Sequence, residues 1–283
     1  MSFDKNIAIY VNPAAGKGKS LELLTVIELL LNKENTKFTT FIKDWPKDYA
    51  EFSEAWIIGG DGTLNYFLNY FPEINIPLVL FKGGTGNDFA WKLYGDISLK
   101  EQLELVLHSN PKAVDAARCN DKIFINGVGI GFDGEVLKSM GAIRLFGGHL
   151  GYLIVVLRKI FTFKEYSFNI RNDMLAMKDR FLLLMISNSS RTGGGFHVSP
   201  LANITDGLLN LVLCNKLSIA KRLQYLPVIE KGKHLGLSFI KHFTGRSFEV
   251  ECDVEVPAQL DGELISARKF VIEVLPARYL FKY

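Results

Sequence analysis

The sequence predicts two domains. An α/β domain, with a parallel sheet flanked by helices, is expected over residues 1–118, and a mainly antiparallel β-sandwich over residues 119–283. The length of 283 residues corresponds to about two domains of ~150 residues. Strand-like and helix-like patterns alternate up to Val114, and strand patterns dominate after it. The last residues of the chain can also pack back on the first domain.

Alternating short apolar runs and helical patterns define the elements expected in the first domain. Each expected strand ends at or just before a turn rich in glycine or polar residues, and a helical pattern follows most of these turns. The expected strands are 7–11, 38–42, 55–58 and 77–81, and the expected helices are 21–31, 64–70 and 99–108.

The second domain carries short strand patterns separated by Gly, Asn, Asp and Pro. This texture predicts antiparallel strands packed as a sandwich. The expected strands are 122–130, 166–171, 181–188, 208–214, 247–252, 254–260 and 270–275. Helices are expected at 150–163 and 219–234.

Composition and charge exclude several classes of protein. Hydrophobic residues make up 48% and charged residues 22% of the chain, which excludes a disordered or collagen-like protein. The 33 basic and 30 acidic residues leave a surplus of +3, too small to indicate nucleic-acid binding. No apolar run is long enough for a membrane span or a signal peptide. The three scattered cysteines lack metal-ligand spacing and fit a reducing, cytoplasmic location.

Three glycine-rich segments follow strands of the first domain, with sequences NPAAGKGKS (12–20), GGDGT (59–63) and GGTGND (83–88). Because ligands of parallel sheets bind beyond the carboxyl ends of the strands, these segments should meet at one edge. Glycines allow a phosphate to approach the backbone N–H groups, and a helix N-terminus favours its charge. The alternative is that the glycines only form tight turns. Asn12, Thr63, Thr85 and Asn87 can add hydrogen bonds.

Two known phosphate motifs are excluded as explanations. A P-loop would place its first glycine on Pro13, which has no N–H to donate. A GxGxxG pattern occurs at 129–134, but it lies beyond the first domain and lacks the acidic residue expected ~20 positions later. We interpret these glycines as close packing at the end of a strand.

The chain resembles the diacylglycerol kinase catalytic family, which is related to sphingosine and ceramide kinases. The resemblance rests on NPAAGKG, GGDGT, GTGNDFA, NGVGIGFD, SPLANITDGLLNLVL and QLDGE, which follow one another in the family's order from about residue 7 to 275. It implies an ATP-dependent lipid kinase whose active site lies between an α/β nucleotide-binding domain and a β-sandwich. It also implies that ATP contacts Asn12, Gly59, Gly60, Asp61, Gly62, Thr63, Gly84, Thr85, Asn87 and Asp88.

The same resemblance places the catalytic carboxylates at Asp261 and Glu263. One of them takes the proton from the lipid hydroxyl; Asp261 is the favoured base, and the reverse assignment stays open. Without the resemblance, Asp261–Gly262 would be interpreted as a hairpin turn.

Two magnesium sites are implied. Asp61 and Asp88 are oxygen ligands suited to Mg²⁺ that bridges the ATP phosphates. A second, structural Mg²⁺ would use the carboxylate of Asp206 with the carbonyl groups of Asn203 and Leu208. The alternative is an Asp–Gly turn that leads into the next strand.

The expected acceptor is diacylglycerol, giving phosphatidic acid. A sphingoid base, ceramide, phosphatidylglycerol or a polyprenol are alternative acceptors, and an NAD kinase or a non-catalytic nucleotide-binding regulator are rival functions. Basic residues border apolar residues in segments 143–166 and 230–248, which suits peripheral contact with a membrane. Packed helices with a solvated face would look the same. The sequence leaves the oligomeric state open, with a homodimer among the possibilities.

Overall fold

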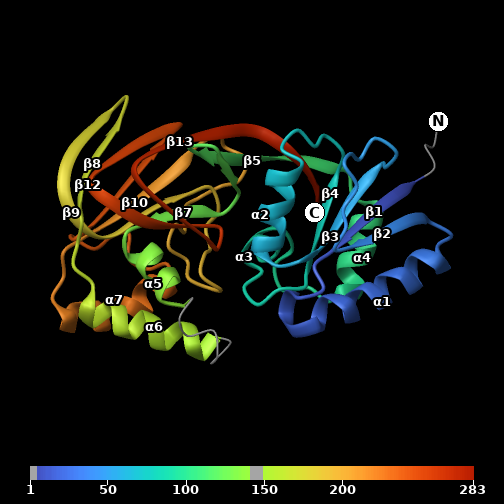
Figure 1. Ribbon diagram of the computed structural model, residues 1–283, viewed down its shortest axis with the longest axis horizontal. Helices are drawn as coiled ribbons and strands as arrows, with labels where there is room; N and C mark the ends of the chain where they lie inside the picture. The colour runs from blue at the N-terminus through green and yellow to red at the C-terminus, as the bar shows by residue number, and fades with distance from the viewer. Residues whose placement is uncertain (1–4, 141–148) are drawn as a thin grey trace. The chain divides into compact units, whose positions relative to one another are not determined.

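The computed structural model describes residues 5–140 and 149–283 (Figure 1). The chain forms two compact units. Unit 1 comprises Met1–Val114 and Ala277–Tyr283, and unit 2 comprises Asp115–Pro276. The structure therefore divides the chain after Val114, whereas the boundary expected from the sequence follows residue 118. The end of the chain returns to unit 1.

Unit 1 contains a sheet of parallel strands in the order β2-β1-β3-β4, with helices around it (Figure 1). Every residue of β3 is buried, as expected for a strand covered on both faces. The strands are β1 (Asn6–Val11), β2 (Lys37–Ile42), β3 (Glu54–Gly59) and β4 (Leu78–Lys82). The helices are η1 (Ala15–Gly18), α1 (Lys19–Lys33), α2 (Asp61–Tyr70), α3 (Asp88–Tyr94) and α4 (Leu99–His108).

The end of the chain is fastened to unit 1 by buried polar contacts. Phe281 pairs in parallel with Leu78 of β4. The Lys282 ammonium lies 3.0 Å from Glu54 Oε1, and both side chains are buried. The hydroxyl group of Tyr94 donates to the Lys282 carbonyl at 3.0 Å. A buried charge pair of this kind is costly to break, so Ala277–Tyr283 is an integral part of this unit.

Unit 2 is built mainly from antiparallel strands. Two long strands, β9 and β12, both pair with β7 at one end and with β8 at the other. The strands are β5 (Pro111–Cys119, which contains the division), β6 (Lys122–Phe124), β7 (Gly127–Ile130), β8 (Ser167–Asn172), β9 (Leu175–Ser187), β10 (Leu209–Asn215), β11 (Ile240–Gly245), β12 (Ser247–Leu260) and β13 (Glu263–Lys282, whose residues from Ala277 on belong to unit 1). The helices are α5 (Phe132–Met140), α6 (His149–Thr162) and α7 (Ile219–Glu230).

The elements of unit 2 differ from the sequence expectation at several places, and α5 and β11 were not expected at all. The strand expected over 122–130 is two strands, because the backbone turns at Ile125–Asn126. The strands expected at 247–252 and 254–260 form one strand, β12, with an irregular register after Glu251. The helix expected over 219–234 ends at Glu230, and Gly232 follows it with φ 68°. The glycines at 129–134 do pack closely: a Cβ on Gly134 would overlap the backbone of Pro257.

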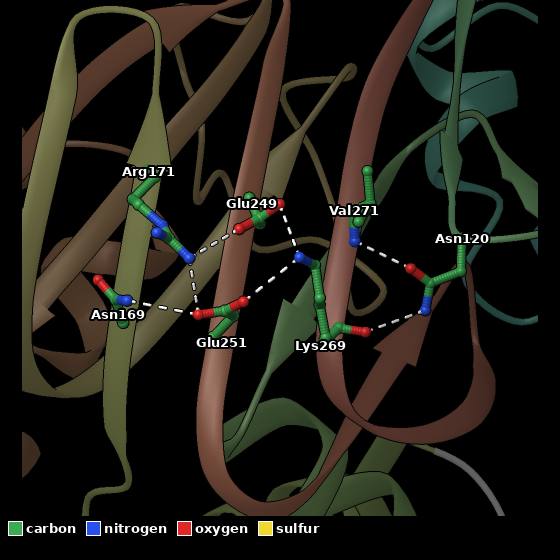
Figure 2. Close-up of polar contacts among 7 residues, drawn as sticks. All are labelled: Asn120, Asn169, Arg171, Glu249, Glu251, Lys269 and Val271. Carbon is green, nitrogen blue, oxygen red and sulfur yellow. Dashed lines mark hydrogen bonds and ion pairs between the residues drawn. The ribbon is translucent and has the colours of Figure 1, made fainter.

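An ion-pair network ties three neighbouring strands of unit 2 together (Figure 2). Arg171 of β8 lies between Glu249 and Glu251 of β12, at 3.0 and 2.7 Å. Lys269 of β13 contacts the same two carboxylates at 2.9 and 3.3 Å. The members are exposed or half-buried, so the network contributes little stability, but it matches charges only in the observed register.

The helices α5, α6 and α7 lie beside one another at one side of unit 2 (Figure 1). Val155, Val156 and Ile160 of α6 form a small core with Val136 of α5. None of the described helices is long and apolar enough to cross a membrane.

Candidate functional site

The three glycine-rich segments of unit 1 meet at one edge of the sheet, as the sequence predicted. They follow β1, β3 and β4, which are neighbours in the sheet. The Asn12 side-chain amide donates to Thr63 Oγ1 at 3.0 Å, which joins the first segment to the second. The Gly83 N–H donates to the Gly59 carbonyl at 2.9 Å, which joins the third to the second.

Several glycines are required by close contacts within and between these segments. A Cβ on Gly59 would overlap the Thr63 side chain, and a Cβ on Gly84 would overlap the Gly60 backbone. A Cβ on Gly60 would lie 3.0 Å from the Gly84 Cα. Close packing within the second segment explains Gly59, and packing of the second segment on the third explains Gly60 and Gly84, without a ligand.

Gly62 is different. It lies exposed in the first turn of α2, and apart from its chain neighbours and the nearby backbone of α2, no described atom lies within 4 Å of the position that its Cβ would occupy. A glycine in a helix costs about 0.5–1 kcal/mol relative to alanine. Because no packing within the chain requires it, the open space at Gly62 is where a ligand could approach the N-terminus of α2.

The two acidic residues of these segments are fixed by backbone contacts at the start of α3. Asp61 accepts hydrogen bonds from the Asp88 and Phe89 N–H groups, both at 2.9 Å, and so caps α3. Asn87 accepts from the Gly84 N–H and donates to the Gly84 carbonyl, both at 2.8 Å, which closes its own loop. Thr85 is exposed on the same loop.

Asp261 of unit 2 is buried and binds a ring of backbone N–H groups. Its Oδ2 accepts from Ile125 at 2.7 Å, and its Oδ1 accepts from Asn126 at 3.0 Å and from Gly127 at 2.9 Å. Three of the roughly four acceptor positions of a carboxylate are thus occupied. Asp261 therefore holds the turn between β6 and β7 against the β12–β13 hairpin.

Glu263 lies two residues further on and is exposed at the start of β13. Asp261 (φ 46°) and Gly262 (φ 93°) form the two-residue turn, with Leu260 paired to Glu263. Positive φ at both positions is the conformation that favours Asp–Gly in hairpins. The hairpin interpretation and the catalytic one therefore describe the same residues.

Asn188 is a site residue that the sequence analysis missed. It is fully buried, and its side-chain amide donates to the Asp115 and Ile125 carbonyls, both at 2.9 Å. Its own N–H donates to the Asn126 carbonyl at 2.9 Å. Asn188 therefore fixes the segment that binds Asp261. Its partners lie more than 60 residues away in the sequence, so no local pattern could reveal it.

The predicted structural magnesium site lies in a turn held by Asp115. Asp115 Oδ2 accepts from the Gly207 N–H at 2.7 Å, and Asp206 Oδ1 accepts from the Leu208 N–H at 3.0 Å. Asn203 Oδ1 accepts from the Thr205 hydroxyl at 3.1 Å. The predicted donors are all oxygens, the chemistry that Mg²⁺ prefers.

Among residues 5–140 and 149–283, no three His, Cys, Asp or Glu residues gather where they could hold a metal ion. Any magnesium there would need carbonyl, water or phosphate oxygens as well.

Burial raises the pKa of the Cys119 and Cys214 thiols to about 12, which leaves both protonated and unreactive.

Family models match both units. The diacylglycerol kinase catalytic domain model matches residues 6–119. The YegS C-terminal NAD kinase beta sandwich-like domain model matches residues 126–280, more than half of the chain. The chain belongs to the YegS-like lipid kinase family. Membership confirms the predicted family and its two-domain architecture.

Relatives of this YegS-like chain cover most of its length. A "Probable lipid kinase YegS-like" of Shewanella frigidimarina is 30% identical and covers 90% of this chain and 84% of its own. Another from Yersinia enterocolitica is 32% identical over 77% of this chain and 74% of its own. A solved structure named "putative diacylglycerol kinase" from Bacillus anthracis has a TM-score of 0.82 and 26% identity, covering 100% of this chain and 96% of its own.

Proposed function

We propose that this YegS-like protein transfers the γ-phosphate of ATP to a hydroxyl group of a lipid, with diacylglycerol as the acceptor. The observation that carries the proposal is the Asp261–Gly262–Glu263 turn. It presents one exposed carboxylate beside a second that is fastened by three N–H groups. Attack by an alcohol requires loss of its proton, and a positioned carboxylate can accept it.

We assign the role of base to Glu263. Its carboxylate is exposed, whereas that of Asp261 is buried and occupied by the N–H groups of residues 125–127. Asp261 is then the residue that orients the turn. This assignment reverses the one favoured from the sequence, and the burial of Asp261 is the reason.

The glycine-rich edge of unit 1 is the proposed site for ATP. The open position at Gly62 allows phosphate oxygens to approach the N–H groups at the start of α2, where the helix dipole favours negative charge. When bound, Mg²⁺ would neutralise charge on the phosphate oxygens. Asp61 and Asp88 are the carboxylates that would hold it at this edge.

A test of ATP binding compares Gly62→Ala with Gly84→Ala. Gly62→Ala has room for its Cβ, so the fold should stay intact while ATP affinity falls about tenfold because the methyl group occupies the phosphate approach. Gly84→Ala should instead destabilise unit 1, because its Cβ overlaps the Gly60 backbone. Calorimetric titration with ATP and thermal unfolding measure the two effects. Unchanged ATP affinity in Gly62→Ala would show that the ATP phosphates do not bind at this position.

The acceptor is tested by a panel of lipids. Purified protein is incubated with γ-labelled ATP, Mg²⁺ and mixed micelles that contain diacylglycerol, ceramide, a sphingoid base, phosphatidylglycerol or a polyprenol. Diacylglycerol should give the highest kcat/KM. Preference for another lipid by tenfold or more would replace diacylglycerol as the acceptor and leave the lipid kinase assignment in place.

A further inference from the structure

The outward side of α6 carries large apolar side chains that remain exposed. Ile154, Leu157 and Phe161 are 51%, 36% and 56% exposed. At positions i, i+3 and i+7 they lie along one stripe of the helix. We call these three residues the α6 stripe. Residues 143–148 of the membrane-contact segment predicted from the sequence lie outside the described residues.

The opposite side of α6 is already packed. Val155, Val156 and Ile160 are at most 3% exposed and contact Val136. A surface helix of a globular protein normally buries one apolar face and shows a polar one to water. Here the inner face supplies the packing against α5, so the exposed part of the α6 stripe is not needed for that contact.

The charges beside the α6 stripe are all positive. Arg158 lies within it, and Lys164 follows the helix; both are exposed, and in the described part of the chain neither forms an ion pair. Lys159, on the inner side, is neutralised by Glu135 at 2.6 Å. Glu165 is buried and pairs with Arg222 at 2.5 Å. The outward face therefore carries basic charge that no nearby carboxylate neutralises.

We propose that the α6 stripe docks this protein on a bilayer that contains anionic lipids. Apolar side chains that enter the boundary between headgroups and acyl chains, next to cations that contact anionic headgroups, are the pattern of an interfacial helix. This docking proposal rests on the proposed function, because a kinase that acts on a lipid must reach that lipid in a membrane. A second copy of the chain fits less well, because a two-fold contact here would bring the same cations together.

Sedimentation with vesicles tests the docking. Full-length protein is mixed with vesicles of phosphatidylcholine alone or with added phosphatidylglycerol. We expect the protein to bind the vesicles that contain phosphatidylglycerol, and we expect this binding to weaken as the salt concentration rises. Leu157→Ser combined with Phe161→Ser should reduce it at least tenfold, and Arg158→Gln about fivefold. The matched control is Leu29→Ser on α1, also an exposed apolar helix residue at 66%, which should bind as the unaltered protein does.

Transfer activity separates this proposal from the proposed function. With a short-chain diacylglycerol dissolved as monomers, the α6 variants should be as active as the unaltered protein. Vesicle binding that is unchanged in the double variant would overturn the docking proposal. So would a shift of that variant from dimer to monomer on gel filtration, because the stripe would then be a protein interface. Suppose instead that neither the unaltered protein nor the α6 variants transfer phosphate to the short-chain lipid, while the α6 variants still bind vesicles more weakly than the unaltered protein. The proposed function then fails and the docking proposal stands.

Discussion

Glu263→Gln should lower kcat for phosphate transfer by about 10²–10⁴-fold while the protein stays folded and ATP still binds. Glutamine has nearly the same shape but cannot take a proton from the acceptor hydroxyl. Because Glu263 is exposed, the change should alter the free energy of unfolding by no more than about 0.5 kcal/mol. Steady-state kinetics and chemical unfolding measure both quantities.

Asp261→Asn is the matched comparison, because it also replaces a carboxylate by an amide in the same turn. One carboxylate oxygen that accepts backbone N–H groups becomes an NH₂ group that faces them. We expect unit 2 to lose about 1.5–3 kcal/mol of stability. A stable Asp261→Asn variant without activity, together with a normally active Glu263→Gln variant, would return the role of base to Asp261.

Arg222→Met should produce the largest loss of stability, about 3–5 kcal/mol. Arg222 is buried in α7, and its guanidinium donates to the Ile160 carbonyl at 2.9 Å and the Phe163 carbonyl at 3.2 Å at the end of α6. It also pairs with Glu165 at 2.5 Å, where both side chains are 7% exposed. Its removal leaves a buried carboxylate and several carbonyl groups without a donor.

Two variants isolate this effect in urea unfolding. Adding Glu165→Leu to Arg222→Met should recover part of the loss, because it removes the unpaired carboxylate. Arg171→Met breaks the exposed network of Figure 2 and should cost no more than about 1 kcal/mol. Equal losses in Arg222→Met and Arg171→Met would show that burial of the Arg222–Glu165 pair does not matter.

The family, the two-domain architecture and the meeting of three loops could be predicted from the sequence. The loops follow because consecutive parallel strands bring their carboxyl ends to one edge, so glycines far apart in the chain meet there. The helix α3 was missed because it is seven residues long and starts inside the GGTGND segment. The division of 122–130 was missed because the turn at Ile125–Asn126 is stabilised by Asp261, more than 130 residues away.

The roles of individual site residues could be predicted less well. GGDGT identifies Asp61 as an important residue, but not that both of its oxygens cap α3. Sequence alone also could not order Asp261 and Glu263, because their difference is one of burial. Asn188 acts through carbonyl groups of distant residues, so its identity as a site residue depends on the fold.

Transfer of label from γ-labelled ATP tests the central claim most directly. The protein is incubated with Mg²⁺ and two acceptors together, diacylglycerol in mixed micelles and NAD in the aqueous phase, and Glu263→Gln is run in parallel. Label should appear in the organic phase with the unaltered protein and be reduced at least a hundredfold with Glu263→Gln. Label on NAD would contradict assignment of this chain as a lipid kinase, and label in neither acceptor would contradict diacylglycerol as its acceptor.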